Sequence, residues 1–398
     1  MEKNAEQKKQ NDRFSKVDLK RFLRNSLLLS LINFVILLAL FYYGESNILK
    51  VRKEGLEKRI QATLQIEHDL LGNEFDYVIS DIAYLKDAYQ DYLQTPEGIE
   101  YAEKEWTIFS DKKKIYDQIR FLDTKGNEVI RINYGEDGAY PVDKADLQNK
   151  ADRYYFTESI GLNPGQYYIS KLDLNVEQGE VEVPYKPMIR ICTPAYNSAN
   201  VLLGVIVFNY KAENLLQSFE RITLADTANH YLLNPSGYWL SSSDTSQEWT
   251  FMFPDKQDIS FKNLYPEEWE AIQDDQLDSE KHLQYTDNGL FAYIKIRFNE
   301  KMINNQTMVE ENRFVLQEGE WTLVTHVDRD GADSVVIGAS VFKTALFVIN
   351  KYLLIFILFV GVSFLITYLL CNMRRARKRL LFFSSYDTMT EVYNRRAG

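Results

Sequence analysis

The stretch PMIRICTPAYNSANVLLGVIVFNY, residues 187–210, contains the clearest pair of β-strands in this chain. Pro187 to Tyr196 and Val201 to Tyr210 are short runs rich in aromatic and β-branched residues, and the polar segment NSAN separates them. Three runs upstream have the same character: Ile115 to Leu122, Val129 to Asn133 and Gln166 to Leu174. Asp152 to Ile160 has a helical pattern. Five strands with one inserted helix predict an α/β module over about residues 100–212.

A pattern of strand, turn and strand recurs further along the chain. His230 to Leu233 and Tyr238 to Ser242 are predicted strands on either side of the turn residues NPSG. Phe291 to Phe298 and Glu320 to Asp328 supply two more, so we expect a second, smaller sheet over about residues 213–328. The segment that follows is predicted to return as helix.

A long helix precedes both sheets. From Glu45 to Thr95 charged and apolar residues alternate with helical period, and Pro96 and Gly98 are expected to end the helix. Its apolar seam advances by steps of three and four through Leu71, Phe75, Val78, Ile82, Leu85, Tyr89 and Tyr92. The seam can pack against its own domain or against a second copy of the chain. We favour the first, because a helix that flanks a sheet needs an apolar face regardless.

Two charge-free apolar stretches flank this region, Ser26 to Tyr43 and Tyr352 to Cys371. At about 1.5 Å per residue each approaches the roughly 30 Å hydrocarbon core of a bilayer, so both are predicted to span the membrane. The alternative for the first is a cleaved signal peptide. A long charged leader precedes it and no small-x-small cleavage site follows it, which favours a retained anchor.

The charge distribution orients the chain. Residues 1–25 contain eight Lys or Arg and residues 374–379 contain five, so both ends are predicted to be cytoplasmic, with the protein in a bacterial inner membrane. Removing the 15 basic and 6 acidic residues of the two ends from the totals of 46 and 57 leaves 31 and 51 in the outer segment. Its formal charge of −20 disfavours binding to nucleic acid.

The cysteines and histidines of the chain are not arranged for a disulfide or for metal binding. Cys192 in the outer segment and Cys371 at the inner end of the second span are separated by the membrane and are not expected to pair. The four histidines, His68, His230, His282 and His326, are scattered, and no Cys/His cluster has zinc-ligand spacing. We therefore expect no cofactor in this chain.

Together these patterns predict an α+β, two-span membrane protein whose outer domain is carried on a long helix. The expected boundaries are a basic leader at 1–25, a first span at 26–43, an outer domain at 45–345, a second span at 346–371 and a linker at 372–385. Within the outer domain we expect the helix at 45–95, a distal module at about 100–212 and a proximal module at about 213–328.

This arrangement resembles the double Cache sensor domains of bacterial signalling proteins. The resemblance covers about residues 45–345 and is most specific from Asp152 to Tyr210, where the chain reads DRYYF, GQYYISKLDL and LLGVIVFNY. It implies two PAS-like modules in tandem, a small solute bound in the distal module, and a conformational change passed through the second span.

The last residues resemble a different family. YDTMTEVYNRRAG, residues 386–398, is similar to the start of GGDEF domains, whose signature is D-x-L-T-G-L-x-N-R-R. The identical positions are Asp387, Thr390, Asn394, Arg395 and Arg396. Glu391 replaces a Gly, which strains the backbone if that residue has positive φ. The resemblance assigns Asn394 to guanine binding, because an amide both donates and accepts hydrogen bonds.

The second resemblance implies a diguanylate cyclase, which forms cyclic di-GMP from two GTP and acts as a homodimer because each catalytic domain holds one GTP. GTP and Mg²⁺ are expected for a complete enzyme, since acidic residues must hold the metal against the triphosphate. No GG(D/E)EF sequence occurs in these 398 residues, so the chain as given is expected to be inactive. The alternative is a non-enzymatic receptor such as a chemoreceptor, for which residues 372–385 are too short to form the usual coiled coil or two-helix linker.

The first resemblance also suggests a binding site. Amino-acid-binding Cache domains carry an R-x-W-Y motif and two aspartates. Arg153, Tyr155 and Phe156 would occupy the motif here. Asp173 would be the middle aspartate, and Asn209 stands where the last aspartate would hold an ammonium. A buried ammonium needs a charged partner, so we favour a small carboxylate or another polar solute over a standard α-amino acid.

Three further residues have open alternatives. Arg131 and Arg190 are candidates for anion binding, because an Arg on a strand offers a planar fork to a carboxylate. The alternative for each is a salt-bridged or surface Arg in an acidic domain. Asn33, in the first span, could hydrogen-bond across a dimer, and a bond within its own helix pair or tolerance of a lone Asn is about equally expected.

Overall fold

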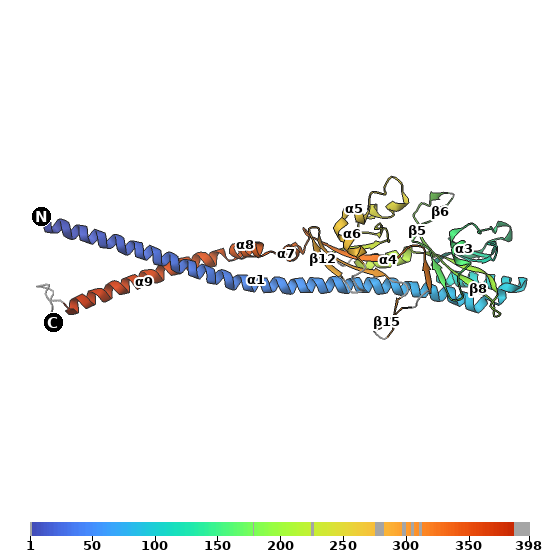
Figure 1. Ribbon diagram of the computed structural model, residues 1–398, viewed down its shortest axis with the longest axis horizontal. Helices are drawn as coiled ribbons and strands as arrows, with labels where there is room; N and C mark the ends of the chain where they lie inside the picture. Colours follow the sequence, from blue (N-terminus) through green and yellow to red (C-terminus); the bar gives the residue numbers. More distant parts are fainter. Residues whose placement is uncertain are drawn as a thin grey trace. The chain divides into compact units, whose positions relative to one another are not determined.

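The computed structural model (Figure 1) describes residues 2–177, 179–223, 227–274, 282–296, 300–303, 306–309 and 313–385. The chain forms two compact units. The first, Gly55–Ile337, contains both sheets and is named the sensor unit. The second combines Met1–Glu54 with Gly338–Gly398 and is named the membrane unit.

The larger sheet of the sensor unit belongs to the distal module. Its strand order is β16-β4-β8-β9-β1-β2-β3, with β5 also pairing with β8, and every pair is antiparallel except β16 with β4. The strands are β1 (Tyr116–Asp123), β2 (Glu128–Gly135), β3 (Gly138–Pro141), β4 (Tyr167–Ile169), β5 (Asp173–Leu174), β8 (Pro187–Tyr196), β9 (Leu202–Lys211) and β16 (Phe314–Leu316). The five strand runs expected here are all confirmed, the third of them divided into β4 and β5.

The smaller sheet belongs to the proximal module and has the antiparallel order β11-β10-β17-β13-β12. Its strands are β10 (Asn229–Leu233), β11 (Trp239–Ser241), β12 (His282–Thr286), β13 (Gly289–Ile296) and β17 (Trp321–Asp328). Two short helices, α5 (Phe261–Leu264) and α6 (Pro266–Gln273), pack on it through an aromatic cluster that includes Trp239 and Phe291. The tandem α+β architecture is thus confirmed, although β12 was not among the expected strands.

Smaller elements complete the sensor unit. Helix α4 (Glu213–Thr223) connects the last distal strand to the proximal sheet. Two hairpins extend from the modules, formed by β6 (Val176–Glu177) with β7 (Glu180–Val181) and by β14 (Glu300–Ile303) with β15 (Gln306–Val309).

The long helix α1 (Glu2–Tyr89) starts earlier and ends earlier than predicted. Its seam from Leu71 to Tyr89 is buried in the sensor unit, so it packs against its own domain. Tyr92 is 47% exposed, because α1 has ended and a short 3-10 helix, η1 (Tyr92–Gln94), follows. Pro96 does not simply end a helix; it begins another, α2 (Pro96–Lys113), at a position where its missing N–H costs little. Thr95 caps this helix by accepting a hydrogen bond from Gly98 N at 3.2 Å.

Three acidic residues along α1, spaced seven apart, face the two sheets. They are Glu67, Glu74 and Asp81. Glu74 and Asp81 each accept a hydrogen bond from a tyrosine of the distal sheet, and Glu67 lies in close contact with a histidine of the proximal sheet. The contacts are His230 Nδ1 to Glu67 at 2.6 Å, Tyr210 Oη to Glu74 at 2.9 Å and Tyr116 Oη to Asp81 at 2.7 Å. A heptad repeat returns to the same face of a helix, so these bonds fix the axial register of α1 against both modules.

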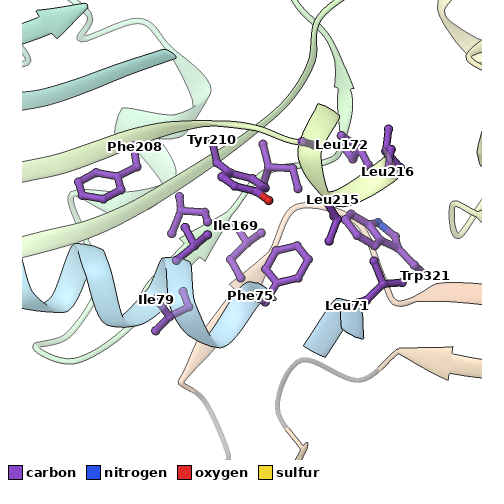
Figure 2. Close-up of a cluster of buried hydrophobic side chains, with 14 of the residues drawn as sticks. Leu71, Phe75, Ile79, Ile169, Leu172, Phe208, Tyr210, Leu215, Leu216 and Trp321 are labelled. Carbon is purple, nitrogen blue, oxygen red and sulfur yellow. The ribbon is translucent and has the colours of Figure 1, made fainter. Parts of the chain in front are cut away.

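One apolar core is shared by the helix and the two modules. Figure 2 shows Leu71 and Phe75 of α1 beside Ile169 of the distal module and Trp321 of the proximal module. The Phe75 and Trp321 rings meet edge to face with centroids 5.5 Å apart. Because this core contains side chains from all three parts, the sensor unit is expected to unfold as one body.

Among the described residues, two helices are long and apolar enough to cross a membrane: Leu19–Tyr89 of α1, whose first part belongs to the membrane unit, and Leu353–Arg377 of α9 (Leu353–Ser385). The first predicted span, 26–43, lies within α1. The return to the second span is less regular than predicted, because α7 (Ser334–Ile337), α8 (Val341–Lys351) and α9 are separate helices.

Polar contacts join the two apolar helices within this unit. Asn33 Nδ2 donates to Ser363 Oγ at 2.9 Å, so Asn33 bonds within its own helix pair. At the other end, Glu45 accepts from Lys351 Nζ at 2.6 Å and from Tyr352 Oη at 2.7 Å. These hydrogen bonds lower the pKa of Glu45, which therefore stays ionised.

Candidate functional site

One face of the distal sheet carries a row of polar side chains. Arg190, Asn209, Gln118 and Asn133 lie on the adjacent strands β8, β9, β1 and β2, each opposite the next in register. Side chains alternate along a strand. The neighbours of these residues on their own strands, such as Phe208 beside Asn209, therefore point to the opposite face, into the core shared with α1. Helix α3 (Tyr154–Ser159) packs over the polar row's face.

Arg190 is the centre of this row. Its Nη1 donates to Tyr154 Oη at 3.0 Å and lies 3.5 Å from Asp173 Oδ1, and its Nη2 lies 3.4 Å from Asn175 Oδ1. Burial would lower the pKa of Arg190, but Tyr154 and Asp173 outweigh it and the pKa is raised. The guanidinium is therefore a permanent cation held on one side of the site.

Asp173 is only weakly neutralised. Burial raises the pKa of its carboxyl and outweighs the opposing effects of Arg190 and Lys171. The two ion-pair distances, 3.5 Å to Arg190 and 3.8 Å to Lys171, explain the weak opposition, because neither is a close contact.

A second cationic group lies two strands away. Arg120 Nε is 3.2 Å from one oxygen of the buried Glu128, and Arg131 Nη1 is 3.7 Å from the other. Arg120 also donates to Gln118 Oε1, and burial lowers its pKa. Two guanidinium groups thus share the Glu128 carboxylate, and the carboxylate of Asp117 also interacts with Arg120.

Asn209 has an unused acceptor. The residue is 4% exposed, and its Nδ2 donates to Gln118 Oε1 at 3.4 Å. Its Oδ1 is buried and has no hydrogen-bond partner within the described residues. An unsatisfied buried acceptor costs about 1–3 kcal/mol, so a donor from a bound solute or water would stabilise this position.

The structure brings some of the predicted site residues together and places others apart. Arg131, Arg190, Asn209 and Asp173 lie on or beside the polar face, and Tyr155 is buried above it. Arg153 is instead exposed at the N-terminus of α3. Among the described residues, its side chain has no hydrogen bond or ion pair with the row.

Sequence reasoning missed Arg120, Gln118 and Tyr154. The two β1 residues alternate with the buried Ile119 and Phe121, so the period-two pattern of that strand contained the signal. Tyr154 directly precedes the predicted Tyr155 and, like it, belongs to the helix that covers the polar face.

The described residues contain no group of three or more His, Cys, Asp or Glu side chains arranged to hold a metal. Cys192 lies beneath α3, and burial raises the pKa of its thiol to about 12, so it is not a nucleophile at neutral pH. Asn394 and the whole GGDEF-like segment 386–398 lie outside the described residues.

A long helix, two largely antiparallel sheets and a polar face in the distal module are the features of bacterial ligand-binding sensor domains with a Cache-like fold. The family model described as "Bacterial histidine kinase, sensor domain" matches residues 78–336, and the chain belongs to this family. No curated protein matches the chain.

Solved structures of two signalling proteins are similar. The domain of a sensory box/GGDEF family protein from Vibrio parahaemolyticus has a TM-score of 0.52 and 24% identity, covering 68% of this chain and 98% of that one. The extracellular domain of the histidine kinase vpHK1S-Z8 has a TM-score of 0.53 and 22% identity, covering 72% and 99%. These likenesses show the fold.

The sensory domain of the Campylobacter jejuni chemoreceptor Tlp3 (CcmL), solved with isoleucine bound, is also similar, with a TM-score of 0.48 and 10% identity over 73% of this chain and 98% of that one. Isoleucine is the ligand of that protein. The fold of this chain therefore occurs in the sensory parts of a histidine kinase and of a GGDEF family protein.

Proposed function

We propose that this chain is the sensory input of a two-pass protein of the bacterial inner membrane and that its distal module binds a small carboxylate from outside the cytoplasm. The observation that supports the ligand class is the gathering of three guanidinium groups, those of Arg120, Arg131 and Arg190, on the polar face. Arg120 and Arg131 share Glu128, and Arg190 is only loosely paired with Asp173. An Arg fork that is not saturated by protein carboxylates suits a carboxylate of a solute.

A binding experiment on the full chain in lipid nanodiscs tests this ligand class. The chain is screened by thermal shift against monocarboxylates, dicarboxylates and hydroxy acids, and affinities of the stabilising compounds are measured by calorimetry. Arg190→Gln and Arg120→Gln are each expected to weaken binding by about tenfold or more, since hydrogen bonds to charged groups contribute about 1.5–3 kcal/mol.

The matched control is Arg221→Gln, which removes an exposed Arg on α4 and should leave affinity unchanged. Arg153→Gln distinguishes the site seen in the structure from the site expected from the R-x-W-Y motif. If Arg153 lies outside the site, the affinity for the carboxylate should change little. If Arg153 acts as in the motif, the affinity should be lost. Carboxylate binding that survives both Arg190→Gln and Arg120→Gln would exclude the proposed site.

The proposed output is cyclic di-GMP synthesis by a GGDEF domain that begins at Tyr386, acting as a homodimer with GTP and Mg²⁺. The segment YDTMTEVYNRR supports this, and the likeness to the Vibrio sensory box/GGDEF domain is compatible with it. The family match makes a histidine kinase output the second candidate. The coding sequence beyond Gly398 distinguishes them, because a cyclase requires an acidic first strand and a GG(D/E)EF hairpin, whereas a kinase or chemoreceptor requires neither.

A further inference from the structure

The distal sheet contains a strand that the chain contributes from its proximal part. In sequence, β16 lies between β13 and β17, two strands of the proximal sheet, yet it pairs in parallel with β4 at the edge of the distal sheet. Val315 packs on the side that carries α3, whereas Phe314 and Leu316 pack against the core shared with α1. β17, the central strand of the proximal sheet, begins at Trp321, so only a short segment separates the two strands. β16 therefore joins the modules directly.

Gln317 fastens the end of β16 to the loop after β4. Its backbone N–H donates to Ile169 O at 2.9 Å, and its side-chain Oε1 accepts from Lys171 N at 3.1 Å. Ser170 lies between Ile169 and Lys171 in sequence and forms two hydrogen bonds with Arg190. Ser170 N donates to Arg190 O at 2.9 Å, and Arg190 N donates to Ser170 Oγ at 2.8 Å. A continuous set of short contacts thus connects the site's central Arg to β16.

Asp173 makes this connection sensitive to occupancy of the site. Its two oxygens lie 3.5 Å from Arg190 Nη1 and 3.8 Å from Lys171 Nζ, so two cations share one carboxylate. A solute carboxylate at Arg190 would repel Asp173 and displace it toward Lys171. Because Gln317 accepts from the backbone N–H of Lys171, a shift of Lys171 acts on β16.

We propose that Gln317 is a positioning residue that couples occupancy of the Arg190 site to the docking of β16 and hence to the proximal sheet. The inference rests on the proposed function, because it takes Arg190 as the anion-binding group. Coupling of this kind is reciprocal, so weakening the dock of β16 also changes the affinity of the site.

Hydrogen exchange measured by mass spectrometry on the full chain in nanodiscs tests the coupling without a ligand. Arg190→Gln removes the cation that Asp173 would lose to a bound carboxylate. We expect exchange rates to change in 167–174 and in 313–321 by about two- to thirtyfold, the range that couplings of 0.5–2 kcal/mol produce. In a Gln317→Leu background the change in 167–174 should persist and the change in 313–321 should be lost.

Gln317→Glu keeps an acceptor for Lys171 N–H and is expected to restore the response, whereas Gln257→Leu, at an exposed position, should leave it as in the wild type. Gln317→Asn, shorter by one methylene, serves as the second disrupting variant if Gln317→Leu unfolds the chain. The coupling is refuted if Arg190→Gln leaves 313–321 unchanged, or if the response persists without the acceptor. Solute affinity is measured separately, so refutation here leaves the carboxylate site standing.

Discussion

His230 Nδ1 lies 2.6 Å from a carboxylate oxygen of Glu67, and both side chains are almost completely buried between the long helix α1 and strand β10. Thr325 Oγ1 lies 3.4 Å from the same nitrogen. The contact between Glu67 and His230 joins α1 to the proximal sheet, and the contacts of Glu74 and Asp81 join α1 to the distal sheet. Buried polar contacts are costly to form and more costly to leave half made, so they specify one register of the helix.

Removal of one partner of this pair should therefore be strongly destabilising. We expect His230→Leu to lower the free energy of unfolding of the chain by about 3–5 kcal/mol, because it leaves the Glu67 carboxylate buried without this partner. The double variant Glu67→Leu/His230→Leu should recover part of the loss. Denaturant unfolding of the four chains in a double-mutant cycle measures the coupling, and strictly additive losses would contradict it.

The shared core predicts cooperative unfolding of the two modules. Trp321→Ala should cost about 3–5 kcal/mol, the usual effect of truncating a buried Trp, and should lower the stability of both modules together. Trp269→Ala, in the separate aromatic cluster of the proximal module, is the control. Hydrogen exchange of β8 and β9 reports on the distal module. Exchange there that is insensitive to Trp321→Ala would mean that the modules unfold independently.

A glycine on β9 allows close approach of two strands. Gly204 has φ +156°, and a Cβ built on it would lie 1.9 Å from Leu122 O of β1. We expect Gly204→Ala to lower the free energy of unfolding by about 2 kcal/mol or more, because the strand must shift or the residue must keep a strained conformation. Gly161→Ala is the matched control, since no atom of the described residues, apart from its own chain neighbours, lies within 4 Å of a Cβ built there. Equal melting temperatures for the two variants would contradict the expectation.

Glu248 should make stability depend on pH. Burial raises the pKa of its carboxyl from 4.5 to about 7, with a further contribution from Glu220, against the hydrogen bond from Ser242 N. Between these values the folded chain binds more protons than the unfolded chain, so this residue's contribution to stability is present below pH 4.5 and lost as pH rises through 7.

Glu248→Gln retains an acceptor for Ser242 N, which lies 2.8 Å from Oε1 in the wild type. The variant's stability relative to the wild type should therefore rise from pH 4.5 to 7 and then level off. Unfolding midpoints measured at several pH values test this. A difference that is constant with pH would show that Glu248 titrates normally.

Much of the fold could be predicted because its signals are local. β-Branched residues and a polar turn predict two strands at 187–210, and the structure has them as β8 and β9. The heptad seam from Leu71 to Tyr89 likewise packs as expected. The candidate site was predicted in part: Arg190, Arg131 and Asn209 share one face by strand alternation. Arg153 instead precedes α3, a helix whose start the pattern could not locate to one residue.

The sequence by itself determined the classes of element and their order, since periodicity, turn residues and apolar runs act over a few neighbours. Only the tertiary structure decided that β16 joins β4, because that pairing links Val315 to Tyr168 across a long stretch of chain and leaves no local signature. The tertiary structure also decided which cationic side chains are only partly neutralised by carboxylates. Arg120 and Arg131 meet at Glu128, and Arg190 meets Asp173, only after the sheet has formed and excluded water from these pairs.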